Sequence, residues 1–164
     1  MGEETATGSV PGLTILHQSG AKNLEVTKSA YAASGADRTR VEVLPFIDDM
    51  PRRFADASLV MCRSGASTVA ELAAAGKPSL LVPFAAAADA HQKRNAEAMV
   101  AAGAAVMLEE PELADPGRLT GTLAGLLKDQ ARLQAMGAAA RLQAHPDAAE
   151  RIANRLAELA GLSD

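Results

Sequence analysis

The sequence predicts an α/β fold, in which a parallel β-sheet carries helices on both faces and is followed by a helical tail. Two observations lead to this prediction. Short apolar runs alternate with helix-like segments up to about residue 110, and strict β/α alternation is typical of a parallel sheet covered on both faces. Beyond that residue the apolar runs stop and the pattern becomes wholly helical.

Five apolar runs have the length and composition of buried parallel strands. They are LTIL (13–16), VEVL (41–44), SLVMC (58–62), SLLVP (79–83) and AAVML (104–108). The segments between them have helical spacing and cover about residues 22–34, 49–55, 66–75 and 91–102. Gly76 and Pro78 supply a C-terminal cap and a stop signal after the third of these helices.

The tail is expected to form three helices over about residues 116–127, 130–142 and 147–161, punctuated by Pro111, Pro116 and Pro146. Ile152, Leu156 and Leu159 lie on one face of the last helix.

A chain of 164 residues can bury the core of one domain. We expect residues 1–12 to be a disordered N-terminus and residues 13–164 to form one Rossmann-like domain. Its β/α part would cover residues 13–110, and the helical tail residues 111–164.

Composition argues against several classes of protein. The net charge is -4 with scattered signs, whereas a nucleic-acid-binding protein shows a basic face. The single Cys62 has no cysteine or histidine partner at metal-ligand spacing, so neither a disulfide framework nor a metal site is indicated. No apolar stretch has the length of a membrane span, and the N-terminus lacks the features of a signal peptide. We therefore expect a cytoplasmic protein without metal or cofactor.

The segment RSGASTVAEL, from Arg63 to Leu72, predicts a strand that runs into the N-terminus of a helix. The unpaired N–H groups and the positive dipole end at such a junction suit a phosphate or diphosphate. Glu71 can present a carboxylate to ribose hydroxyls one turn later. In a competing interpretation, Ser67 or Thr68 only caps the helix and Glu71 closes a capping box.

Polar or glycine-rich loops follow four of the predicted strands. The carboxyl ends of parallel strands meet at one edge of a sheet, where open α/β folds bind ligands, so we expect one site there. The loops are His17 to Gly20, Phe46 to Met50, Arg63 to Thr68, and Phe84 with the segment from Asp89 to Asn95.

Four blocks in these loops resemble the C-terminal half of the MurG family of peptidoglycan N-acetylglucosaminyltransferases, which are GT-B glycosyltransferases. The blocks are HQSG (17–20), FIDDM (46–50), CRSGASTVAEL (62–72) and VPFAAAADAHQKRNA (82–96). In that family this half holds UDP-GlcNAc, and the whole enzyme transfers GlcNAc with inversion to a lipid-linked muramyl-pentapeptide. The resemblance implies a donor-binding half that needs no metal and is not catalytically competent alone. It also implies a parent enzyme that is peripheral on the cytoplasmic face of the membrane.

The resemblance implies roles for the matching residues. Ile47 would meet the uracil through its backbone, with Phe46 walling the base and Met50 nearby, and Glu71 would bind the ribose. Gln92, with Asp89 nearby, would contact the GlcNAc hydroxyls. The residues implied to face the diphosphate and sugar are Arg63, Ser64, Gly65, Ala66, Ser67 and Thr68. Further candidates for ligand contact are His17, Gly20, His91 and Asn95, and no catalytic residue is expected in this half.

Several of these residues also have an ordinary structural interpretation. His17 can satisfy a turn or backbone group, and His91 can lie on a helix surface. Asp48 and Asp49 fit helix N-terminal residues that the dipole stabilises. Arg63 can anchor its loop by hydrogen bonds, although we favour contact with a phosphate.

The acceptor-binding half of the family has no counterpart in this sequence, nor has the strand with a GGS-type loop that opens the family's C-terminal half. Because that strand is central in a doubly wound sheet, its absence predicts exposed strand edges or a gap, and hence impaired folding or association. An acceptor-binding domain is then the expected partner, in the same parent chain or as a separate subunit of a split transferase. The lipid-linked acceptor would bind through it. Two other functions stay open, namely another UDP-sugar enzyme of the GT-B fold and an interaction module without ligand.

Overall fold

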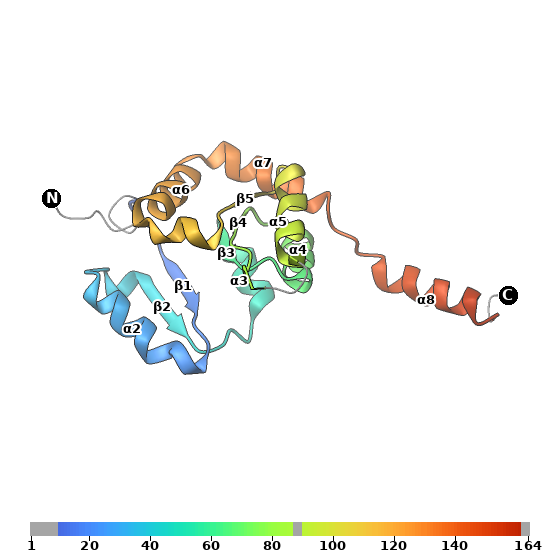
Figure 1. Ribbon diagram of the computed structural model, residues 1–164, viewed down its shortest axis with the longest axis horizontal. Helices are drawn as coiled ribbons and strands as arrows, with labels where there is room; N and C mark the ends of the chain where they lie inside the picture. The colour runs from blue at the N-terminus through green and yellow to red at the C-terminus, as the bar shows by residue number, and fades with distance from the viewer. Residues whose placement is uncertain (1–9, 87–89, 162–164) are drawn as a thin grey trace.

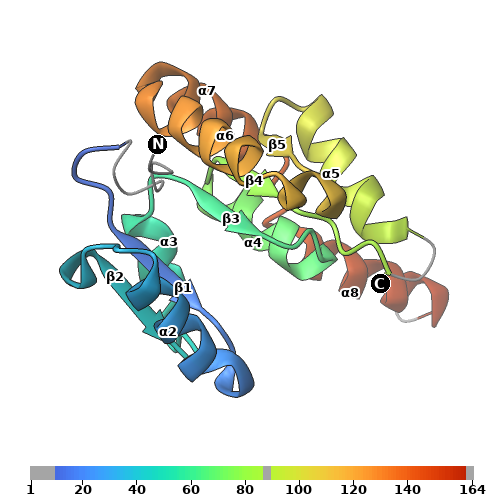
Figure 2. The ribbon, with the colours of Figure 1, turned by 60° about the vertical axis from the view of Figure 1, so that its left-hand side comes forward.

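The strands form two small parallel sheets in the computed structural model, which describes residues 10–86 and 90–161. One sheet pairs β1 (Ile15–Gln18) with β2 (Val41–Leu44). The other has the order β3 (Val60–Cys62), β4 (Ser79–Leu81) and β5 (Ala105–Met107). Figures 1 and 2 show β1 on the side of its sheet that is nearer to β3. Within the described ranges β1 and β3 each pair on one side only, which confirms the expected open strand edges.

The predicted order of elements is confirmed. The helices and 3-10 turns are η1 (Ala21–Asn23), α2 (Leu24–Ala33), η2 (Arg38–Arg40), α3 (Met50–Asp56), α4 (Ala66–Ala75), α5 (His91–Ala101), η4 (Glu110–Ala114), α6 (Pro116–Lys128), α7 (Gln130–Arg141) and α8 (Ala148–Leu159). The turns η2 and η4 were not expected from the sequence, and the first predicted helix begins as the turn η1. Of the N-terminus expected to be disordered, residues 1–9 lie outside the described residues. Val10 to Leu13 form a turn closed by a 3.2 Å backbone hydrogen bond.

The first strand lies two residues further along the chain than its apolar run predicts. Its register pairs Ile15 with Val41 and Gln18 with Leu44, so the strand extends as far as its partner does. His17 and Gln18 are therefore strand residues, and the prediction that they belong to a loop is wrong. The hydrogen-bond ladder decides these bounds, not the hydropathy of one strand.

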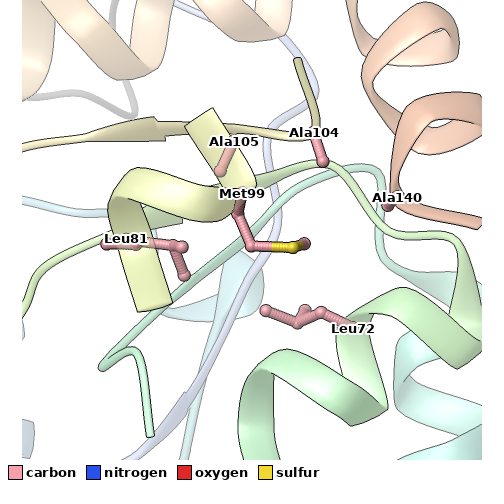
Figure 3. Packing of buried hydrophobic residues seen from close by; sticks show 7 residues of the cluster. Leu72, Leu81, Met99, Ala104, Ala105 and Ala140 are labelled. Atoms are coloured by element: carbon pink, nitrogen blue, oxygen red, sulfur yellow. The ribbon is translucent and has the colours of Figure 1, made fainter. Parts of the chain in front are cut away.

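Two clusters of buried side chains lie on opposite faces of the larger sheet. Figure 3 shows one of them, which brings together Leu72 of α4, Leu81 of β4 and Met99 of α5. The other consists of Leu126, Leu133 and Met136 from α6 and α7, and it packs against Val106 of β5. Val106 alternates with Ala105 and Met107, which contact the first cluster, so the two clusters occupy the two faces. Helices on both faces of a parallel sheet are thus confirmed.

The last helix, α8, lies away from the remainder of the molecule (Figure 1). Ile152, Leu156 and Leu159 are 61%, 62% and 69% exposed, so its apolar face has little cover. None of the helices in the described ranges is long and apolar enough to cross a membrane.

Candidate functional site

The junction between β3 and α4 has the strand-to-helix form that its sequence predicts. Gly65 is the N-cap residue of α4, and no side chain caps this helix. Ser67 and Thr68 lie inside the first turn, and Glu71 is exposed further along the helix. The capping-box interpretation is therefore wrong, because the helix begins at Ala66, before the two residues that would have capped it. Its first N–H groups receive no side-chain cap, so they remain able to bind an anion.

Three other helices show what an ordinary cap looks like in this molecule. Asp49 accepts a hydrogen bond from the backbone of Arg52 at the start of α3. Asp115 and Asp129 cap α6 and α7 in the same manner. Asp49 thus has the structural role that the sequence allowed. The starts of α2, α5 and α8, like that of α4, have no side-chain cap hydrogen bond.

The start of α5 resembles that of α4. Its N-cap residue, Ala90, has a left-handed φ of 50° and no side-chain cap hydrogen bond, and His91 begins the helix in an exposed position. A positive φ at a non-glycine residue is uncommon and costly, so the surrounding structure must impose it. Since α5 follows β4, which pairs with β3, the two uncapped helix starts belong to neighbouring strand ends.

Buried hydrogen bonds tie these two helix starts together. Ser64 is fully buried, and its hydroxyl donates to the carbonyl oxygen of Gln92 over 2.8 Å. The side-chain amide of Asn95 donates to the carbonyl oxygen of Ser64 over 3.0 Å. Both side chains were candidates for ligand contact, and both hold the site's backbone here. Their direct contact with a ligand stays a prediction.

Gln92, the residue expected to contact the sugar, is half-buried in the first turn of α5. Its side-chain oxygen accepts a hydrogen bond from the backbone N–H of Phe84 over 3.0 Å. This bond connects α5 to the loop that follows β4. Asp89, its expected neighbour, lies outside the described residues.

Arg63 anchors the same loop. Its guanidinium donates to the carbonyl oxygens of Val82 and Pro83, each over 3.2 Å, and forms a 2.5 Å ion pair with Glu110. The guanidinium carbon also lies 5.3 Å from the ring centre of Phe84. The anchoring interpretation accounts for these contacts, and contact with a phosphate stays a prediction.

Glu110 was not expected from the sequence to belong to this region. One carboxylate oxygen pairs with Arg63 and the other accepts the backbone N–H of Ala85 over 3.0 Å. The Ala85 hydrogen bond, followed by the Arg63 guanidinium, lowers the pKa of the Glu110 carboxyl. Its place just after β5, at the same sheet edge, is the one signal that points to it.

The end of β2 carries a second group of predicted residues, in the other sheet. Phe46 is 64% exposed and Ile47 is 9% exposed. An exposed aromatic side chain is therefore followed in the chain by a buried aliphatic one. The backbone N–H of Ile47 donates to the side-chain oxygen of Gln18 over 2.9 Å. A base that used this N–H would have to displace Gln18. Met50 is the first residue of α3 and is half-buried.

Two further candidates have structural roles at the end of β1. His17 Nδ1 lies 3.1 Å from the hydroxyl of Tyr31, and the two rings meet edge to face. This contact joins β1 to α2. Gly20 has φ 74° and ψ 152°, a backbone conformation that is essentially confined to glycine.

The pKa of the free Cys62 thiol is shifted by its surroundings, which include Glu71. Burial, together with the negative charge of Glu71, raises the pKa of Cys62 to about 11. Glu71 lies on α4, the helix that follows β3. Among the described residues, no group of three or more histidine, cysteine or acidic side chains is placed to hold a metal ion.

Two surface hollows lie elsewhere. One is bounded by α2 and β2, with Tyr31 and Val43 in its lining, and the other by β5 and α7, with Met107 and Met136. None of the predicted ligand residues lines either hollow. The candidate site described above consists of loops and helix starts that follow the strands.

A parallel sheet with helices on both faces places this chain in the class of doubly wound α/β domains. Within this class, residues 3–152 match the glycosyltransferase family 28 C-terminal domain, and the chain belongs to this family.

The chain is similar to enzymes named UDP-N-acetylglucosamine--N-acetylmuramyl-(pentapeptide) pyrophosphoryl-undecaprenol N-acetylglucosamine transferase. It is 48% identical to the one from Ralstonia nicotianae over 85% of this chain and 38% of the relative. It is 51% identical to the one from Halorhodospira halophila over 89% of this chain and 40% of the relative. The chain therefore spans about two fifths of the length of these relatives.

A solved structure gives the same picture. The crystal structure of MurG from Acinetobacter baumannii matches with a TM-score of 0.79 and 33% identity, over 89% of this chain and 43% of that one. The expected resemblance and the α/β fold are thus confirmed.

Proposed function

We propose that this chain is the donor-binding half of an inverting glycosyltransferase that uses UDP-GlcNAc. The reaction would transfer GlcNAc to a lipid-linked muramyl-pentapeptide, converting lipid I to lipid II in peptidoglycan synthesis. Family membership and the names of the relatives support this proposal. The observation that carries it is the start of α4, which lacks a side-chain cap and is followed by an exposed Glu71.

The chemistry of this junction suits the donor. Negative charge develops on the departing diphosphate during glycosyl transfer, and unpaired N–H groups at a helix start stabilise such charge without a metal. Glu71 would accept hydrogen bonds from the ribose hydroxyls, and Gln92 would contact those of GlcNAc. Phe46 and Ile47 would form the wall beside the uracil.

The acceptor would bind a second domain, in the same parent chain or in a separate subunit, which would also supply the catalytic base. We therefore propose that residues 13–164 act as one domain that binds the donor and has no transferase activity alone. The parent enzyme would act at the cytoplasmic face of the membrane, where its lipid-linked acceptor is anchored.

Titration calorimetry of the purified chain with UDP-GlcNAc, UDP-GalNAc and UDP tests the proposal. Glu71→Ala should weaken binding of all three ligands about ten- to a hundredfold, because hydrogen bonds to a charged group are worth about 1.5–3 kcal/mol. Gln92→Ala should weaken UDP-GlcNAc binding and remove the preference over UDP-GalNAc.

Glu97→Ala is the matched control, because Glu97 is also an exposed glutamate, on α5, and has no proposed ligand contact. It should bind all three ligands as the unmodified chain does. Binding that Glu71→Ala leaves intact would contradict the assigned site. A folded chain that binds none of the ligands would contradict self-sufficient donor binding.

A further inference from the structure

We propose that Arg63 and Glu110 are positioning residues, which fix the loop after β4 and thereby aim Gln92 at the sugar of the donor. This inference rests on the proposed function. In this role Arg63 supports donor binding without contacting the diphosphate itself.

The contacts join three segments that are distant in sequence. Arg63 directly follows β3, Val82 to Ala85 follow β4, and Glu110 begins the turn after β5. The guanidinium bonds to two carbonyl oxygens of the middle segment and to the carboxylate of the third. The pair therefore spans the ends of three adjacent strands and fixes the middle one from both sides.

Two consecutive backbone N–H groups show how this anchoring reaches Gln92. Phe84 donates to the side chain of Gln92, and Ala85 donates to Glu110, each over 3.0 Å. Releasing Ala85 from Glu110 would free the peptide beside it. Gln92 would then lose the group that orients its side-chain oxygen.

The exposure of the pair indicates a geometric role and not a contribution to global stability. The Arg63 and Glu110 side chains are 48% and 29% exposed, and ion pairs exposed to solvent stabilise a fold little. Here, however, each carboxylate oxygen has its own partner, so the pair restrains direction as well as distance. Loss of the pair should loosen the loop while leaving the fold intact.

Glu110 also compensates the positive charge of Arg63. The carboxylate neutralises the guanidinium, and Phe84 covers its face. An arginine held in this way is already engaged by protein groups. The negative charge of the donor would be met by the start of α4 instead.

Calorimetry with two ligands separates the effect on the sugar from the effect on the diphosphate. Glu110→Ala should leave the affinity for UDP within about twofold and lower that for UDP-GlcNAc about tenfold. Glu110→Gln should lower it less, because the amide oxygen still accepts from Ala85. Arg118→Gln is the matched control, since it breaks the 3.1 Å pair between Arg118 and Glu112 of the same turn without touching the loop.

An equal loss for UDP and UDP-GlcNAc in Glu110→Ala would overturn the proposal, because the pair would then serve the diphosphate. Unchanged affinity for both ligands would overturn it too. Either result leaves the donor-binding proposal standing as long as the unmodified chain binds.

Hydrogen exchange measures the positioning contact without any ligand. In Glu110→Ala the amides of Phe84 and Ala85 should exchange about tenfold faster, with the amides of β4 unchanged, and Arg118→Gln should change neither group. If the unmodified chain binds no nucleotide, the proposed function fails and exchange alone decides the positioning contact. Unaltered exchange at Phe84 and Ala85 would overturn it.

Discussion

Ser64 and Ser79 are two fully buried serines with opposite hydrogen-bond situations. The Ser64 hydroxyl donates to the carbonyl oxygen of Gln92, whereas that of Ser79 has no partner among the described residues. A buried hydroxyl without a partner is a cost to the fold, because it has lost its bonds to water.

Ser79→Ala should therefore leave the free energy of unfolding unchanged or raise it by up to about 1 kcal/mol, while Ser64→Ala should lower it by about 1–2 kcal/mol. Urea denaturation of both variants and the unmodified chain measures the difference. The hydroxyl of Ser79 would have an unseen partner if its removal cost as much as that of Ser64.

Some residues of the candidate site could be predicted from the sequence and others could not. The chemistry of Gly65 to Thr68 and of Glu71 follows from local order along the chain, so the strand-to-helix junction could be predicted. The side chains of Gln18 and Glu110 act through backbone groups of Ile47 and Ala85. Those partners are set by strand register across the sheet, and a single sequence does not give that register.

Among the elements, α4 has the bounds that its sequence predicts, 66–75, because its end is fixed by local chemistry. Gly76 adopts a left-handed φ of 61° as the cap, and Pro78 follows. The bounds of the strands were predicted less accurately, because the end of a strand depends on the neighbouring strand that it pairs with. The turn η4 combines a proline with a capping box between Glu109 and Glu112, a short local motif that the apolar pattern does not reveal.

The contact between α4 and α7 depends on a second glycine. A Cβ added to Gly137 of α7 would lie 2.8 Å from the backbone carbonyl oxygen of Gly76. Gly137→Ala should lower the free energy of unfolding by about 1–3 kcal/mol, because a backbone atom at the end of α4 must move to admit the methyl group. Chemical denaturation measures this effect.

Gly125→Ala on α6 is the matched control, since a Cβ there would meet nothing within 4 Å. The same substitution at this exposed helical position should raise the free energy of unfolding by about 0.5–1 kcal/mol. Equal effects of the two substitutions would contradict the close approach of α7 to Gly76.

On the scale of the whole molecule, the sheet is divided in two, and β1 and β3 present unpaired edges within the described ranges. The resemblance to the family led us to expect open strand edges or a gap, and the described residues show such edges. The path of α8 was not predictable. The spacing of its apolar residues fixes a helix and its apolar face, but not what that face packs against.

The exposed apolar face of α8 leads to a prediction about the whole chain. Replacing Ile152, Leu156 and Leu159 together by glutamine should change Tm by less than about 2 °C, because these side chains are already 61–69% exposed and bury little area. Leu133→Gln on α7, where the side chain is 4% exposed, should by contrast lower the free energy of unfolding by about 3 kcal/mol or more.

Calorimetric melting, combined with sedimentation at several concentrations, tests both expectations. The triple variant should also associate less, since a solvent-exposed apolar stripe favours contact between molecules. A fall in Tm of the triple variant comparable with that of Leu133→Gln would mean that α8 folds back onto the domain in solution. Its apolar face would then belong to the core, and not to a surface left for another domain or molecule.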